Sequence, residues 1–174
     1  MRHLLRHLGL ALATALAAGT AGAGDAATTV LLVRHAEKAT EVRTQDPGLS
    51  PAGLARAQAL AHAAGSAQVA AIYVSQFKRT QQTVAPLAAG LNLTPIEHPA
   101  GDVNGLAQAI RTNWNGRTVL VAGHSNTVPQ IVTALTGAPM EDIPDNQYDN
   151  LFVVVLPATG GASTTHLRYG APTP

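Results

Sequence analysis

The chain has 174 residues and a formal net charge of +1, with 46% hydrophobic and 3% aromatic residues. This length suggests one domain, and so small a charge offers no electrostatic argument for nucleic-acid binding. Cysteine is absent, which excludes disulfides, cysteine nucleophiles and thiolate metal ligands.

The first 23 residues have the pattern of an export signal. A basic start contains Arg2 and Arg6, residues 8–18 form an apolar run too short to span a bilayer comfortably, and Ala-Gly-Ala at 21–23 is typical of a cleavage site. We predict cleavage after Ala23, a single domain at residues 24–174 and a periplasmic or secreted protein. An uncleaved membrane anchor or an amphipathic helix is the alternative. Losing Arg2 and Arg6 would change the formal charge from +1 to −1.

Beyond the signal, apolar strands alternate with helical patterns. Strands are expected at residues 28–33, 69–74, 91–96, 118–122, 151–156 and 164–169. Helices are expected from Ser50-Pro51 to Gly65 and at residues 77–89, 103–113 and 128–135. This alternation predicts an α/β three-layer sandwich, with a mostly parallel central sheet flanked by helices. No later segment is long and apolar enough to be transmembrane, so stable membrane insertion after cleavage is not expected.

Polar clusters follow three of the apolar strands. They are Arg34-His35, Lys78-Arg79 and His124-Ser125-Asn126. The carboxyl ends of parallel strands lie along one edge of a sheet, so these clusters are expected to converge. Arginine suits phosphate oxygens, and a histidine held neutral at one nitrogen can attack phosphorus. The pattern therefore indicates a phosphate site with His35 as the nucleophile.

Four segments in chain order resemble the histidine phosphatase superfamily, the phosphoglycerate mutase-like group. They are Arg34-His35-Ala36-Glu37, the helix start at residues 49–59, Ser75 with residues 78–83, and Gly123-His124-Ser125-Asn126. The resemblance is to the short bacterial phosphatases and implies the phosphoglycerate mutase-like fold. It also implies that His35 takes the phosphoryl group while Arg34, Arg79 and His124 hold its oxygens.

The same resemblance implies a general acid from the loop after the third strand. Glu97 and Asp102 are both candidates. Asp102 is favoured because Ala100-Gly101-Asp102 at a helix start resembles the short bacterial members, although aspartate there is also a common helix cap. Ser125 and Asn126 are expected either to bind phosphate or to cap the next helix.

The remaining ionisable residues have structural interpretations. Glu37 and Lys38 are interpreted as a solvated rim of the site, with direct contact to substrate as the alternative. His62 and His166 belong to no cluster, and His98 is a lone loop histidine next to the candidate acid. A zinc site at His35 and His124 is disfavoured, because it lacks thiolates and a close pair of histidines.

The leading functional hypothesis is metal-independent hydrolysis of a small-molecule phosphomonoester, with no cofactor and no nucleic-acid partner. A phosphoglycerate mutase-type phosphotransferase is one alternative, although the interval between Arg79 and His124 is short and export argues against a glycolytic role. A catalytically inactive phosphate-binding module is another. Loops at residues 39–48, 97–101 and 140–150 are expected to set specificity. The pattern indicates neither the substrate nor the oligomeric state.

Overall fold

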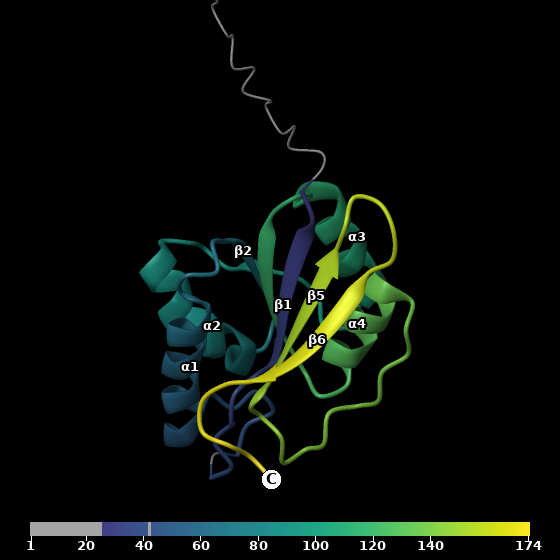
Figure 1. Cartoon of the computed structure of the whole chain (residues 1–174). Helices are drawn as coiled ribbons and strands as arrows, with labels where there is room; N and C mark the ends of the chain where they lie inside the picture. The colour runs from purple at the N-terminus through teal and green to yellow at the C-terminus, as the bar shows by residue number, and fades with distance from the viewer. Residues whose placement is uncertain (1–25, 42) are drawn as a thin grey trace, which may run out of the picture.

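Six strands form one sheet between two layers of helices in the computed structural model, which describes residues 26–41 and 43–174 (Figure 1). The strands are β1 Thr28–Arg34, β2 Val69–Val74, β3 Ile96–Glu97, β4 Thr118–Gly123, β5 Asn150–Leu156 and β6 Ser163–Arg168. The helices are α1 Pro51–Ala64, α2 Lys78–Leu91, α3 Val103–Asn113 and α4 Thr127–Thr136.

The order of strands across the sheet is β3-β2-β4-β1-β5-β6. The first four run parallel to one another, whereas β5 is antiparallel to both β1 and β6. The predicted α/β sandwich with a mostly parallel sheet is therefore confirmed. β1 and β4 lie side by side at the centre, so their carboxyl ends meet at the same edge.

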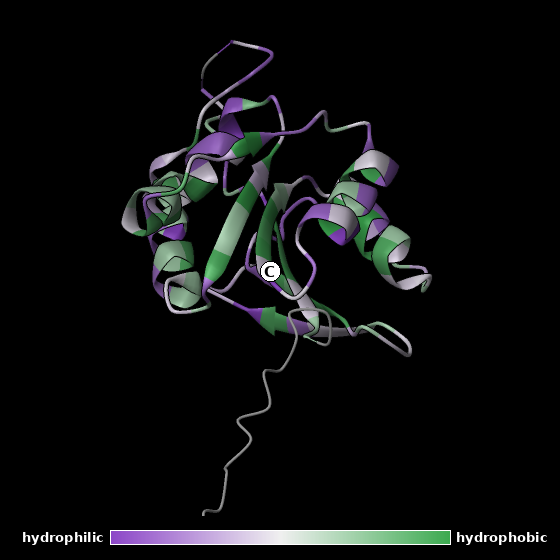
Figure 2. Cartoon of the chain, turned by 90° about the horizontal axis from the view of Figure 1, so that it is seen from above, coloured by the Kyte–Doolittle hydropathy of each residue, from purple (hydrophilic) through white to green (hydrophobic). Residues whose placement is uncertain are grey.

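Each face of the sheet carries its own hydrophobic core. Val30 and Leu32 of β1 pack with the buried residues of α3 and α4. Leu31 and Val33 point to the opposite face and pack with α1 and α2. Successive strand residues face opposite sides, so a strand covered on both faces must be apolar throughout. Figure 2 shows this arrangement, with hydrophobic strands enclosed between the two helical layers.

The start of α1 agrees with its sequence pattern. Ser50 is the N-cap and accepts a hydrogen bond from the Gly53 amide at 3.1 Å, and Pro51 occupies the first helical turn. Proline is favourable there because its missing N–H would have no partner within the helix.

The predicted strand at residues 91–96 was largely wrong. Leu91 ends α2, which continues past Pro86, and Asn92 adopts a left-handed conformation with φ of 53°. The amides of Asn92 and Leu93 then bond to carbonyls in the last turn of the helix. Asparagine enters the left-handed region more readily than most residues. These residues therefore close the helix, and β3 is limited to Ile96–Glu97.

The predicted signal sequence at residues 1–23 lies outside the described residues. Within residues 26–41 and 43–174, none of the helices combines the length and the apolar character needed to cross a bilayer.

Candidate active site

The carboxyl ends of β1 and β4 place two histidines beside each other. Arg34 and Gly123 are paired in the sheet, and the His35 amide then donates to the Gly123 carbonyl at 2.9 Å. The rings of His35 and His124 consequently lie edge to face, with their centroids 5.4 Å apart.

A pocket of about 400 Å³ opens beside these rings. Six of the predicted site residues line it: Arg34, His35, Arg79, His124, Ser125 and Asn126. Lys38, Phe77 and Asp145 also line it. The structure thus brings together the three polar clusters that follow the strands.

His35 is held in one tautomer by its own backbone neighbour. Its Nδ1 lies 2.8 Å from the Ala36 carbonyl oxygen. A carbonyl only accepts hydrogen bonds, so Nδ1 carries the proton and Nε2 keeps its lone pair. Burial lowers the pKa of His35 to about 3, and the nearby charges of Arg34 and Arg79 act in the same direction, against the opposing effect of the Ala36 carbonyl. At neutral pH the ring is uncharged and its Nε2 can act as a nucleophile.

The residue after the nucleophile fits as alanine. Ala36 is buried and its amide donates to the Thr83 hydroxyl at 2.9 Å. Among the described residues, the non-glycine positions with positive φ are Gln68 and Asn92. Ala36 therefore does not need the left-handed backbone that would favour glycine.

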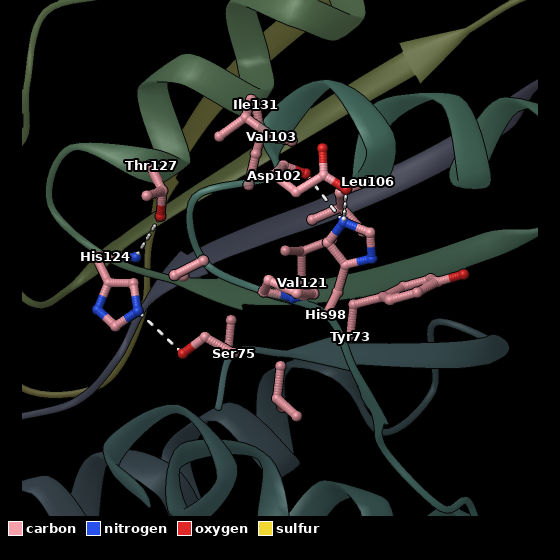
Figure 3. A pocket seen from close by; sticks show the side chains of 15 residues that line it. Tyr73, Ser75, His98, Asp102, Val103, Leu106, Val121, His124, Thr127 and Ile131 are labelled. Carbon is pink, nitrogen blue, oxygen red and sulfur yellow. Dashed lines mark hydrogen bonds and ion pairs between the residues drawn. The ribbon is translucent and has the colours of Figure 1, made fainter. Parts of the chain in front are cut away.

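His124 is oriented by a pair of hydroxyl groups. Its Nε2 lies 3.0 Å from Ser75 Oγ (Figure 3), and Ser75 Oγ lies 2.9 Å from Thr80 Oγ1. Its Nδ1 lies 3.4 Å from Nη2 of Arg79. Because arginine only donates, Nδ1 is the acceptor and Nε2 carries the proton. Burial lowers the pKa of His124 to about 4, assisted by the charges of Arg79 and Arg34.

The two arginines differ in the contacts that they make within the protein. Nη1 of Arg34 donates to the carbonyls of Pro144, Asp145 and Gln147 at 2.9–3.0 Å, while its buried Nε has no partner. Arg34 therefore fastens the loop before β5 to the site, while its Nη2 lies 3.6 Å from the Asp145 carboxylate.

Arg79 is held from the opposite side of the pocket. Its guanidinium lies over the Phe77 ring at 4.3 Å, and Nη1 is 3.7 Å from the Asp46 carboxylate. Burial lowers the pKa of Arg79, and Asp46 partly opposes this effect. Since both histidines are neutral, the two arginines and Lys38 supply the positive charge that attracts an anion.

Asp102 and Glu97, the two predicted acids, lie outside the lining of this pocket. Asp102 caps α3 by accepting from the Gly105 amide at 3.0 Å, and its other oxygen is 3.2 Å from His98 Nε2. Figure 3 shows Asp102 turned toward His98, away from His124. Glu97 is exposed and lies 3.4 Å from Gln81 Nε2. Asp102 therefore has the cap role that aspartate often has, and its role as acid stays a prediction.

Ser125 and Asn126 line the pocket at the start of α4. Asn126 is the N-cap of that helix, yet its side chain makes no capping hydrogen bond. The Ser125 carbonyl accepts from the Ile143 amide at 2.9 Å. The side chain of Asn126 thus stays free of the capping bond that was one of its two expected roles.

The interpretation of Glu37 as a solvated rim was wrong. Its carboxylate is paired with the buried Arg56, with Oε1 lying 2.8 Å from Nη2. Arg56 is on α1, and no local pattern connects it with Glu37. Lys38, by contrast, lines the pocket.

Sequence reasoning also missed several residues around the site. Ser75 belongs to one of the four segments that resemble the family, so the sequence did indicate that it lies near the site. Asp46 and Asp145 lie in loops, and no sequence pattern indicated that they are near the site. Among the described residues, no group of three or more histidines and carboxylates is placed to hold a metal ion.

Comparisons with known proteins identify one matching family. Residues 30–101 match the family model of the histidine phosphatase superfamily (branch 1). No curated protein matches the chain. The match confirms the predicted resemblance, and three of the four motifs lie within the matched residues.

Solved structures share the fold. The protein histidine phosphatase SixA complexed with tungstate aligns with a TM-score of 0.65 at 22% identity, over 80% of this chain and 96% of that chain. The putative phosphohistidine phosphatase SixA from Agrobacterium tumefaciens gives 0.60 at 20% identity, over 83% and 98%. A putative alpha-ribazole-5'-P phosphatase from Escherichia coli gives 0.66 at 12% identity, over 81% and 96%.

Proposed function

We propose that this chain, which matches the histidine phosphatase superfamily, is a metal-independent phosphomonoester hydrolase that works through a phosphohistidine on His35. The observation that carries the proposal is the state of His35. Its Nδ1 is bonded to the Ala36 carbonyl, which leaves a neutral Nε2 beside a pocket lined by Arg34 and Arg79. A fixed tautomer next to fixed positive charge suits attack on a phosphoryl group.

The reaction proceeds in two displacements. Nε2 of His35 attacks phosphorus, and the N–P bond forms as the bond to the leaving oxygen breaks. Arg34 and Arg79 stabilise the negative charge that spreads over the phosphoryl oxygens. Water then attacks the phosphohistidine, and an O–P bond forms as the N–P bond breaks. The water proton passes to the carboxylate that protonated the leaving group, inorganic phosphate is released and Nε2 regains its lone pair.

The leaving oxygen needs a proton in the first displacement, and we propose Asp102 as the donor ahead of Glu97. A second hollow of about 470 Å³ lies between α3 and α4, and Asp102 lines it. Gly101 lines both this hollow and the pocket beside His35 and His124, which we call the phosphate pocket. The two spaces therefore adjoin. A leaving group lying in the hollow would have Asp102 beside it.

The hollow also bears on the class of substrate. Its polar lining includes the side chains of Asn104, Gln130 and Thr133, and none of the lysines and arginines in the described part of the chain lines it. A second phosphate on the leaving group would find no cation there and would face the Asp102 carboxylate. The arrangement therefore favours substrates with one phosphate and an uncharged leaving group.

A phosphorylated protein side chain is a second candidate substrate class. One of the solved structures with this fold is a protein histidine phosphatase, and 96% of its length is covered. A panel containing alkyl phosphates, aryl phosphates and a phosphohistidine peptide separates the two classes.

The central test is trapping of radiolabelled phosphate on the protein during turnover. Wild type is expected to carry acid-labile label, and His35→Ala is expected to lose both label and turnover. His62→Ala is the matched control, because His62 is an exposed histidine on α1. Wild-type turnover of an aryl phosphate by His35→Ala would refute the mechanism. Label without release to water would favour a phosphotransferase, and absence of label would favour a binding module.

We further propose that residues 1–23 are an export signal and that residues 24–174 act as a single domain in the periplasm or outside the cell. The support is the basic, apolar and small-residue order of the first 23 residues. Expression in a bacterial host, followed by fractionation and amino-terminal sequencing, tests this. Exported protein beginning near Gly24 is expected, and cytoplasmic protein that retains the segment would contradict it.

A further inference from the structure

Arg56 lies at a buried junction between α1, the turn after His35 and the C-terminal tail. It is only 4% exposed. Its Nε lies 3.0 Å from both carboxylate oxygens of Glu37, and Nη2 is 2.8 Å from one of them. Nη1 donates to the Tyr169 carbonyl at 3.1 Å and Nη2 to the Ala171 carbonyl at 3.0 Å. Figure 1 shows the tail leaving β6 and passing the foot of α1.

The same tail is fastened a second time at Thr173. Its hydroxyl donates to the Asp149 carboxylate at 2.5 Å and accepts from the Tyr148 amide at 3.1 Å. Asp149 is buried, and its other oxygen accepts from the Thr173 amide at 3.3 Å. The Tyr148 amide and the side chain of the next residue, Asp149, are thereby both held by the tail.

The two anchors, Arg56 and Thr173, hold segments that contact His35 and Arg34 in the phosphate pocket. Glu37 directly follows Ala36, whose carbonyl accepts from Nδ1 of His35. The Tyr148 ring lies 4.2 Å from the Arg34 guanidinium and 6.2 Å from the His35 ring. One anchor thus borders the nucleophile, and the other borders an arginine of the phosphate pocket.

We propose that residues 169–173, here called the C-terminal strap, position the active site through two positioning residues, Arg56 and Thr173. Arg56 holds the turn that orients His35, and Thr173 holds the ring that packs on Arg34. The inference rests on the proposed function, because positioning is meaningful only if these groups act on a phosphate.

The two anchors should affect different steps. Lysine in place of Arg56 keeps the charge but lacks the planar fork that bonds Glu37 and two carbonyls at once. The turn would shift, and the Ala36 carbonyl would no longer hold His35. Small displacements of a reacting group can cost up to roughly a hundredfold in rate. Arg56→Lys should therefore lower kcat by about tenfold or more, while phosphate affinity changes little.

Thr173→Val keeps the shape of the side chain and removes its hydroxyl. Tyr148 would lose one backbone anchor, and its packing on Arg34 would loosen. This variant should weaken binding of inorganic phosphate and raise KM, with a smaller effect on kcat. Thr173→Ser restores the hydroxyl and should restore both values.

The experiment measures kcat and KM with an aryl phosphate, phosphate affinity by calorimetry and the His35 tautomer by ¹⁵N NMR. The matched control is Arg111→Lys, because Arg111 also donates to a backbone carbonyl, that of Leu135, on the other helical layer. Arg111→Lys should lower the melting temperature without changing kcat, KM or the tautomer.

A loss of the single His35 tautomer in Arg56→Lys, together with weaker phosphate binding in Thr173→Val, supports the inference. If both variants lose only thermal stability, as Arg111→Lys does, the strap is merely structural and the inference is overturned. The NMR and binding measurements do not depend on turnover. An inactive wild type would therefore refute the proposed function, while those two readouts would still decide whether the strap positions His35 and Arg34.

Discussion

The hydroxyl of Ser75 lies 3.0 Å from Nε2 of His124, although the two residues are 49 positions apart in the chain. Ser75 directly follows β2 and His124 directly follows β4, and these strands are neighbours in the sheet. Since Arg79 donates to Nδ1, the proton of His124 is on Nε2, which donates to the Ser75 hydroxyl. The other nitrogen, Nδ1, is thereby left toward Arg79 and the phosphate pocket.

Ser75→Ala is expected to weaken both stability and turnover. The change leaves a buried N–H of His124 without a partner, which costs about 1–3 kcal/mol of unfolding free energy. It also removes one of the two hydrogen bonds that orient the ring, so kcat/KM should fall. Denaturant unfolding and steady-state kinetics measure the two effects. Ser163→Ala, on the exposed strand β6, is the control, and equal behaviour of the two variants would contradict the role of Ser75.

Stability should decline as the pH falls from about 6.5 toward 3. The folded-state pKa values of His35 and His124 are about 3 and about 4, below the ordinary value of 6.5, chiefly because of burial. Between these limits the unfolded chain binds protons that the native state does not. The slope of stability against pH is therefore positive in this window. Above pH 6.5 both histidines make their full contribution to the unfolding free energy.

Denaturant unfolding at several pH values between 4 and 7.5 measures this slope. His124→Gln removes one of the two groups and should make the slope shallower. His62→Gln removes an exposed histidine and should leave the slope close to that of the wild type. An unchanged slope in His124→Gln would mean that this ring is not held neutral in the folded protein.

The acid is tested by comparing leaving groups. Asp102→Asn removes the proton donor but keeps a good helix N-cap, so α3 should stay intact. An alkyl phosphate has a poor leaving group and should lose much more activity than an aryl phosphate, whose phenolate leaves without full protonation. Glu97→Gln should affect neither substrate. Full activity of Asp102→Asn on alkyl phosphates, or a selective loss in Glu97→Gln, would exclude Asp102 as the donor.

Two glycines in helices should respond in opposite directions to alanine. A Cβ at Gly53 would overlap the backbone of Glu37, whereas a Cβ at Gly90 has no neighbour within 4 Å. Gly90→Ala should raise the unfolding free energy by about 0.5–1 kcal/mol. Gly53→Ala should lower it and reduce kcat, because the turn after His35 must move. Thermal unfolding and kinetics of both variants check this, and a neutral Gly53→Ala would contradict the close packing of that turn.

The order of elements was predictable because it depends on local pattern. β1 faces a helical layer on each side, so residues 30–33 are all apolar, and the ionisable residues begin at Arg34, the last residue of the strand. The third strand was mispredicted because Leu91 and Leu93 look like strand residues. The left-handed turn at Asn92 assigns them to the end of α2 instead.

The sequence by itself determined the fold class and the residues that gather at one sheet edge, since periodicity and motif order are local properties of the chain. Only the tertiary structure decided the tautomers of His35 and His124, the partner of Glu37 and the direction in which Asp102 points. Each of these depends on which group the side chain contacts in the folded protein. That group is either distant in sequence or placed by a local turn of the backbone. Arg56 and the Tyr169 carbonyl, for example, are 113 positions apart. Hydrogen bonds and burial of this kind arise from tertiary packing, so a residue pattern does not predict them.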